Sequence, residues 1–132
     1  MYCCNNYFCI SKDRKRRPDD FMRLARRVRD GPNTALMFIS DYYAVEAVNF
    51  LWEQGIRVPD DVSVTGFDDN ILSRVVRPRL TTVHQNVSQK AEMAIKTLFE
   101  LLDGELEAPF SLTLPARLVK GKSVRNISDF SS

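Results

Sequence analysis

The chain has 132 residues, of which 44% are hydrophobic and 27% charged, and its formal net charge at pH 7 is +2. This size and composition are typical of one ordinary soluble domain, or of part of one, and exclude two large domains. The longest uninterrupted apolar run, Ala35 to Ile39, is far shorter than the roughly 20 residues of a membrane helix, so we expect a cytoplasmic protein without a membrane segment.

The first residues of the chain combine cysteines with a basic run. Cys3, Cys4 and Cys9 form an odd, clustered set, which favours free thiols over a disulfide framework or a zinc site, and we expect no metal and no cofactor. Nine Lys or Arg and four Asp lie between Lys12 and Asp30, so this stretch carries +5 and the rest of the chain −3. Such a run can bind nucleic-acid phosphates. No recognition motif accompanies it, so a solvated charged face is the preferred interpretation.

The first regular element is a helix that begins at Pro18 and ends at Gly31. Apolar residues recur between them at helical spacing: Phe21, Leu24, Ala25 and Val28. Thr34–Ser40 follows as a continuous apolar run without alternation. This pattern predicts a short strand that is buried on both faces of a parallel sheet.

A second helix and a second strand complete a βαβ unit. Ser40 or Asp41 caps the helix and Gly55 ends it, while its apolar stripe consists of Ala44, Val48, Leu51 and Trp52. Val62–Phe67 is a short segment rich in β-branched residues, as strands are. Strand, helix and strand over about 35 residues predict parallel pairing of the two strands.

The rest of the chain contains a third strand, the clearest helix and an edge strand. Asp69–Arg79 is irregular, with one helical turn, and Leu80–Gln85 is the third strand. Ser88–Leu102 has apolar residues on one face and is followed by a stop glycine. In the extended stretch Ser111–Val119, an internal proline favours an edge strand.

Polar residues follow all three strands of the predicted parallel sheet, as the pairs Ser40-Asp41, Asp68-Asp69 and His84-Gln85. Ligands of open α/β sheets bind outside the carboxyl ends of the strands, because the loops diverge there. Carboxylate and amide groups at that edge suit the hydroxyls of a sugar or a nucleoside.

Two other interpretations of these residues remain open. Asp41, Asp68 and Asp69 could hold Mg²⁺ for phosphoryl transfer, although no glycine-rich phosphate loop is present. Alternatively, Asp41 is only a helix cap and Asp68-Asp69 only a turn. No nucleophile lies in a recognisable catalytic context, so we expect that the protein is not an enzyme.

Three motifs resemble the effector-binding core of LacI/GalR-type bacterial transcription regulators, and they occur in the family's order and spacing. The match is strong in these three and extends more weakly to 114–119, so that it covers about 31–122. The motifs lie at Asn33–Ala44 (NTALMFISDYYA), Gly55–Asp69 (GIRVPDDVSVTGFDD) and Pro78–Gln85 (PRLTTVHQ).

The resemblance implies an α/β fold of the type I periplasmic-binding-protein kind, in which two lobes enclose a small effector. The chain is too short for both lobes, so we expect a parallel sheet flanked by helices and an incomplete two-lobe core. The chain would comprise an irregular segment (1–17), the C-terminal part of an effector-binding domain (18–125) and a tail (126–132). DNA would be bound only by a domain absent from this chain.

The resemblance also implies which residues bind the effector. Ser40 and Asp41 take the place of a family pair usually written Asn-Asp. Asp68 takes the place of an effector-contacting aspartate, and Gln85 that of a glutamine at the crossover between lobes. The serine departs from the family pattern, because its hydroxyl reaches less far than an amide. The effector would be a sugar, a sugar phosphate or a purine.

The family forms dimers through the face that follows these motifs, and a homodimer is therefore expected. The corresponding positions here are Val45, Asn49, Leu72, Val75 and Val76. The helix 88–102 would also lack the sheet on which the family packs it, so that its apolar face needs another cover, most simply a second copy of the chain.

The favoured hypothesis is therefore an effector-binding and dimerisation part of a LacI/GalR-type regulator. A soluble sugar-binding receptor with the same fold is the alternative, and a Mg²⁺-dependent phosphoryl-transfer or receiver-like domain is a third.

Overall fold

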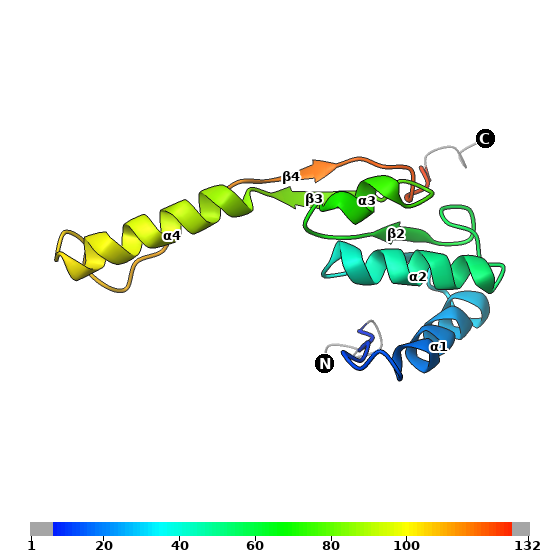
Figure 1. The fold of residues 1–132 in the computed structure, drawn as a ribbon. Helices are drawn as coiled ribbons and strands as arrows, with labels where there is room; N and C mark the ends of the chain where they lie inside the picture. Colours follow the sequence, from blue (N-terminus) through cyan, green and yellow to red (C-terminus); the bar gives the residue numbers. More distant parts are fainter. Residues whose placement is uncertain (1–6, 128–132) are drawn as a thin grey trace.

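The computed structural model describes residues 7–127, in which four helices and four strands occur (Figure 1). Helix α2 lies along β2, and α1 packs on the other side of α2, whereas α4 projects away from these elements (Figure 1). In chain order the elements are α1 (Arg17–Asp30), β1 (Ala35–Met37), α2 (Asp41–Glu53), β2 (Ser63–Thr65), α3 (Ile71–Val75), β3 (Thr82–Gln85), α4 (Val87–Leu102) and β4 (Ala116–Val119).

The strands lie in the order β1, β2, β3, β4. β1 and β2 pair in parallel, with Leu36 opposite Val64, which confirms the predicted βαβ unit. Parallel bridges at Thr65↔Thr81 and Asp68↔His84 place β3 on the other side of β2. β4 pairs with β3 in the antiparallel sense and forms the edge that the proline before it favoured. The carboxyl ends of β1, β2 and β3 therefore meet at one edge.

The hydrophobic core lies between α1, α2 and the sheet. Its α2 residues recur at helical spacing, and Val62 and Val64 fill the space beneath them from β2. Phe21 and Leu24 from α1 cover the far side of α2, where the Phe21 and Phe50 rings lie 5.7 Å apart. This core fixes the position of the N-terminus of α2, which is the part of the helix nearest to the polar sheet edge.

The first strand differs from the prediction. Met37 and Ile39 are 78% and 86% exposed, so β1 is not buried on both faces. No strand pairs with its outer edge within residues 7–127, and the apolar run therefore lacks the cover that it would need. β2 has a neighbouring strand on each edge, and of its three residues only Val64 is buried.

The basic run is only partly a solvated face. Residues 12–16 are exposed, but Arg17 is buried, and its guanidinium donates to both carboxylate oxygens of Glu46 at 3.0 and 2.9 Å. It also donates to the Tyr42 hydroxyl at 3.2 Å and to two backbone carbonyls. Arg17 thus joins the start of α1 to α2. Cys9 is a free, exposed thiol, whereas Cys3, Cys4 and most of the expected tail lie outside the described residues.

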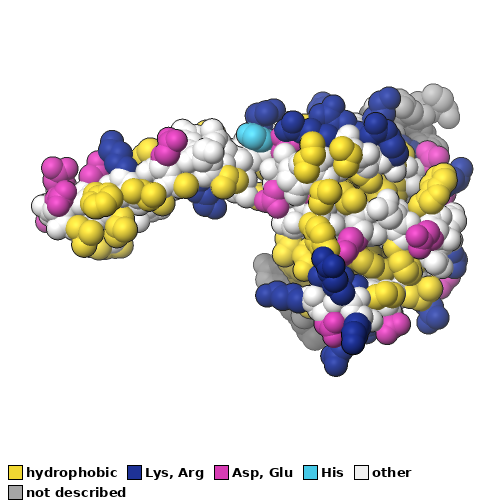
Figure 2. All heavy atoms as spheres, viewed as in Figure 1, with side chains coloured by type: hydrophobic (Ala, Val, Ile, Leu, Met, Phe, Trp, Pro, Cys, Tyr) yellow, Lys and Arg dark blue, Asp and Glu magenta, His cyan; other side chains and the backbone are white. Residues whose placement is uncertain are grey.

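Helix α4 has no buried residue, which confirms that its apolar face lacks cover. Yellow hydrophobic side chains are visible along this projecting helix (Figure 2). Among the described residues, no helix is both long and apolar enough to cross a membrane.

Candidate functional site

Asp41 is the buried centre of the polar sheet edge. It is the first residue of α2 and is fully buried. Its Oδ1 accepts a hydrogen bond from the Thr82 hydroxyl at 2.5 Å, and its Oδ2 accepts one from the Asn70 backbone N–H at 2.9 Å. A Cβ at Gly66 would overlap Asp41 Oδ1, so only glycine allows this close approach. Asp41 thereby ties α2, β3 and the loop after β2 together.

Asp68 and Gln85 lie at the same edge and are partly exposed. The Gln85 amide donates to Asp68 Oδ1 at 3.0 Å, and the Asp68 backbone N–H donates to the Val83 carbonyl at 2.9 Å. Asp68 has φ 113° and Asp69 has φ 53°, both in a region that residues with side chains rarely adopt. Such backbone strain persists where the surrounding structure enforces it, and functional sites are common places for it.

Asp69 and His84 form a second cluster; His84 and Gln85 are consecutive residues of β3, so their side chains point to opposite faces of the sheet. Asp69 Oδ2 lies 3.0 Å from His84 Nδ1 and accepts a hydrogen bond from the Arg74 guanidinium at 3.2 Å. Asp69 Oδ1 is buried and has no hydrogen-bond partner among residues 7–127. The sheet thus separates a charged cluster from the Asp68–Gln85 pair.

The pKa values of the two buried carboxyl groups, Asp41 and Asp69, are shifted in opposite directions. Burial raises the pKa of Asp41 above its ordinary value; the hydrogen bonds from Thr82 and Asn70 oppose this effect only partly, and the nearby charges of Asp68 and Asp69 add to it. Burial also acts to raise the pKa of Asp69, but the hydrogen bonds and charges of Arg74 and His84 outweigh it and hold that pKa below the usual range. Negative charge is therefore favoured at Asp69 and disfavoured at Asp41.

The structure places Asp41, Asp68 and Gln85 at one sheet edge, and Ser40 directly precedes Asp41 in the chain. The Ser40 hydroxyl caps α2 by accepting from the Tyr42 N–H at 3.3 Å. Sequence reasoning missed Thr82 and Asn70, the two partners of Asp41. A Thr on a predicted strand gives no signal of its own, although an Asn before a helical turn is a capping signal that could have been used.

No group of three or more His, Cys, Asp or Glu in residues 7–127 is arranged to hold a metal ion. The Asp41 oxygens accept hydrogen bonds from protein donors, as do one oxygen of Asp68 and one of Asp69. The partly exposed Asp68 carboxylate and Gln85 amide can form hydrogen bonds with the hydroxyl or N–H groups of a ligand.

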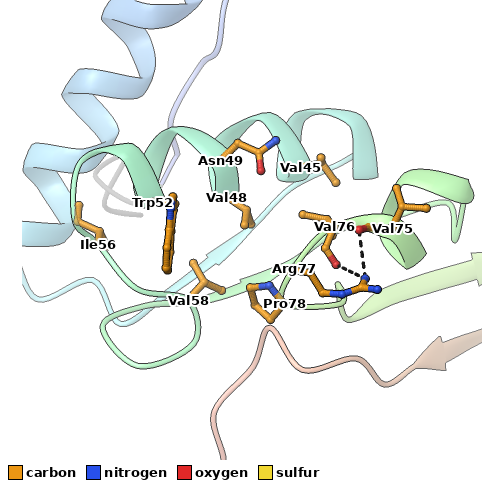
Figure 3. Close-up of a pocket in the computed structure, with 10 residues that line it drawn as sticks. All are labelled: Val45, Val48, Asn49, Trp52, Ile56, Val58, Val75, Val76, Arg77 and Pro78. Carbon is orange, nitrogen blue, oxygen red and sulfur yellow. Dashed lines mark hydrogen bonds between the residues drawn. The ribbon is translucent and has the colours of Figure 1, made fainter.

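An open groove of about 610 Å³ lies between α2 and the segment that includes the end of α3 and the residues after it (Figure 3). It contains four of the five residues expected at a dimer interface: Val45, Asn49, Val75 and Val76. The fifth, Leu72, is half-buried on α3 and does not line it. The remaining lining residues are Val48, Trp52, Ile56, Val58, Arg77 and Pro78.

The sequence matches a known family model and several curated proteins. Residues 4–124 match the model of the periplasmic binding protein-like domain. The HTH-type transcriptional repressor PurR of Pasteurella multocida is 32% identical over 111 residues, which are 83% of this chain and 33% of the relative. The PurR of Mannheimia succiniciproducens is 37% identical over 95 residues, or 72% of this chain and 28% of the relative. The chain thus spans about a third of the length of these curated relatives, which are transcriptional repressors.

Solved structures of transcription regulators are also similar to this chain. The transcriptional regulator CelR in complex with cellobiose matches 80% of this chain and 32% of its own, with a TM-score of 0.72 and 28% identity. The Lac repressor dimer, bound to operator and the anti-inducer ONPF, matches 79% of this chain and 36% of its own, with a TM-score of 0.68 and 31% identity.

Proposed function

The chain belongs to the periplasmic binding protein-like domain family, in the form that LacI-type transcription regulators carry as their effector-binding domain, and on this premise we propose that it binds a small effector and forms a dimer within such a regulator. DNA contact is assigned to a separate domain of the regulator. The protein acts in the cytoplasm by binding and carries out no catalysis.

The observation that carries the proposal is the contact between Gln85 and Asp68 at the exit of two neighbouring strands. The exposed parts of this amide and carboxylate offer both a donor and an acceptor to a hydroxyl or a ring nitrogen. Ser40, a half-buried residue directly before Asp41, is the third polar group that we assign to this site. Asp41 acts indirectly, because it is fully buried and its oxygens already bind Thr82 and Asn70, so it positions the loop that carries Asp68.

The effector is a sugar, a sugar phosphate or a purine. A sugar is supported by the similar regulator CelR, whose structure is a complex with cellobiose and which is 28% identical to this chain. A purine is suggested by the name of the PurR repressors.

The groove between α2 and α3 is the part that forms the dimer. Its lining is mainly apolar and open to solvent, and exposed apolar surface of this kind is typical of protein interfaces. A dimer is also recorded for the related Lac repressor. Val45, Asn49, Val75 and Val76 would be covered by the partner, with Leu72 behind them.

A thermal-shift screen tests the effector role. Sugars, sugar phosphates and purines are added to the native chain and to the Asp68→Asn variant, and Tm is measured. We expect at least one compound to stabilise the native chain, by about 2.7 kcal/mol at 100 times its Kd. Asp68→Asn should lose most of this shift, because its amide presents only one acceptor oxygen.

Asp60→Asn is the matched control. Asp60 is an exposed loop residue whose charge is similar but which lies away from the sheet edge, so this variant should keep the full shift. The effector role is refuted when no compound raises Tm, or when Asp68→Asn responds as strongly as Asp60→Asn.

A further inference from the structure

Two successive residues of β3 hold two successive aspartates, with one pair on each face of the sheet. Gln85 donates to Asp68 Oδ1 at 3.0 Å, and His84 Nδ1 lies 3.0 Å from Asp69 Oδ2. Asp68 and His84 also lie opposite each other in a parallel bridge. Because the two aspartates are adjacent in the chain, contacts that fix the Asp69 side chain also limit the positions that the Asp68 carboxylate can take.

The backbone at these two aspartates has to be held in place by its surroundings. Their φ angles are 113° and 53°, and residues with side chains adopt such values only where the surrounding structure enforces them. Part of the restraint comes from β3: the Asp68 N–H donates to the Val83 carbonyl at 2.9 Å, and the Asp69 N–H donates to the Thr82 hydroxyl at 3.4 Å. The contacts of the Asp69 side chain add to this restraint.

Arg74, Asp69 and His84 form what is called here the charged cluster. The Asp69 side chain is only 3% exposed, and both the Arg74 guanidinium, at 3.2 Å, and the His84 ring contact its Oδ2. Asp69 Oδ1 is buried and has no hydrogen-bond partner among residues 7–127. A buried carboxylate with one unpartnered oxygen depends on the charges beside its other oxygen. Arg74 is always charged, so the hold on Asp69 varies with the charge of His84.

The His84 ring is 33% exposed, so it can exchange a proton with solvent. The charged groups around it come from three elements. Asp69 contacts the ring from the loop after β2, Arg74 of α3 binds the same Asp69 oxygen, and Asp68 is the bridge partner of His84. Arg117 of β4 is the cross-strand partner of His84 and therefore lies on the same face of the sheet.

A proton on the His84 ring strengthens its contact with Asp69. Histidine is the side chain that ordinarily changes its charge between about pH 5 and pH 8, and His84 is the only histidine in the chain. A charged ring donates a stronger hydrogen bond to a carboxylate than a neutral ring does. Asp69 is therefore held more firmly when the ring is protonated.

We propose that the charged cluster positions the Asp68 carboxylate for the effector, and that protonation of His84 tightens the contact between Asp68 and Gln85. This inference rests on the proposed effector site and adds the residues on the opposite face of the sheet that order it. Below the midpoint of the ring titration, imidazolium and guanidinium together fix Asp69. Above the midpoint, the neutral ring holds Asp69 less firmly, and the contact between Asp68 and Gln85 opens more often. The site thus binds its effector more tightly at the lower pH.

NMR spectra of the native chain, recorded as pH is varied, test the coupling without any added compound. The ring signals of His84 are unambiguous, because the chain has no other histidine. We expect the side-chain amide signals of Gln85 to shift with the same midpoint as the ring. The backbone N–H of Gln85 is next to His84 in the chain and should follow the ring in any case, so it is the internal reference. The side-chain amide of Gln54, at the far end of α2, should not shift with this midpoint.

Asp69→Asn separates coupling through Asp69 from the mere proximity of the ring. This variant keeps an acceptor for the ring but removes the charge. We expect the His84 ring and the Gln85 backbone N–H still to titrate, whereas the Gln85 side-chain amide loses its pH-dependent shift. His84→Gln, at a partly exposed position, gives a second comparison if Asp69→Asn does not fold by circular dichroism. Its amide does not titrate, so the Gln85 side-chain amide should again lose the shift. Asp60→Asn, in an exposed loop, is the matched control and should keep it.

Two results overturn the inference. One is a Gln85 side-chain amide that does not follow the ring titration in the native chain. The other is an amide that shifts by the same amount in the native chain and in Asp69→Asn or His84→Gln. Neither result bears on the effector role, which the thermal-shift screen measures separately. Conversely, a screen in which no compound raises Tm refutes the effector role and leaves the measured coupling between His84 and Gln85 unaffected.

Discussion

Asp41 and Asp69 are both buried carboxylates at one sheet edge, yet their surroundings favour opposite protonation states. Asp69 accepts a hydrogen bond from the Arg74 guanidinium and lies 3.0 Å from His84 Nδ1, and both neighbours favour its ionised form. Asp41 has only a hydroxyl and a backbone N–H as donors, and two other aspartates lie near it. Burial therefore sets the direction of the pKa at Asp41, whereas at Asp69 the contacts with Arg74 and His84 outweigh burial.

The raised pKa of Asp41 predicts a measurable dependence on pH. A carboxyl with a raised folded pKa contributes stability that is fully present below its unfolded pKa and is lost as pH rises through the folded value. Asn does not titrate and can still accept from Asn70. The Tm of Asp41→Asn minus the native Tm should therefore increase by a few degrees between pH 4 and pH 7.

Asp69→Asn provides the opposite sign. The lowered pKa of Asp69 contributes stability above its unfolded pKa, and this contribution is lost as pH falls through the folded value. The Tm of this variant relative to the native chain should thus become more negative as pH rises. If the difference in Tm between Asp41→Asn and the native chain stays constant over the pH range, the pKa of Asp41 is not raised by burial.

At the scale of elements, the attachment of α1 to α2 depends on one guanidinium. Arg17 Nη1 donates to both Glu46 oxygens and to the Tyr42 hydroxyl, while its Nε and Nη2 donate to two backbone carbonyls; a Lys, with one nitrogen, cannot reach all of these acceptors. We expect Arg17→Lys to lower Tm by about 5 °C. The neighbouring substitution Arg16→Lys, at a side chain that is 79% exposed, should leave Tm unchanged. Equal Tm values for the two variants would show that Arg17 does not anchor the helix.

Much of the element order was predictable, because helix spacing and strand propensity are local properties. The predicted helices, and the predicted parallel pairing of β1 with β2, are confirmed. The exposure of β1 was not predictable. An apolar run indicates that a strand is suited to burial, but it does not indicate whether another part of the structure covers the strand. The role of Arg17 was not predictable either, because it lies in a basic run and differs from Arg16 only in its contact with Glu46, which is distant in the sequence.

The candidate site was predictable in position but not in the roles of its residues. Polar residues after parallel strands must share an edge, so the proximity of Asp68 and Gln85 followed from topology. The burial of Asp41 depends on Thr82, which is 41 residues away in sequence, and on the space that Gly66 leaves. Such packing is absent from any local pattern.

At the scale of the whole molecule, the chain divides into a packed body and the projecting helix α4. The body contains the complete buried core and the polar edge, whereas α4 has an apolar face without cover. The segment matched here is about a third of the length of the curated relatives. The proposed effector site and the proposed dimer groove are separate surfaces, so a variant of one should leave the other intact.

The most direct test of the account is the side-chain amide signal of Gln85 in a ¹⁵N-labelled chain, assigned by its loss in Gln85→Glu. Addition of a compound that raises Tm should shift this signal in proportion to binding. The amide of Gln54, at the far end of α2, should not move. A compound that stabilises the chain while the Gln85 amide stays in place would show that the effector binds elsewhere and would contradict the proposed site.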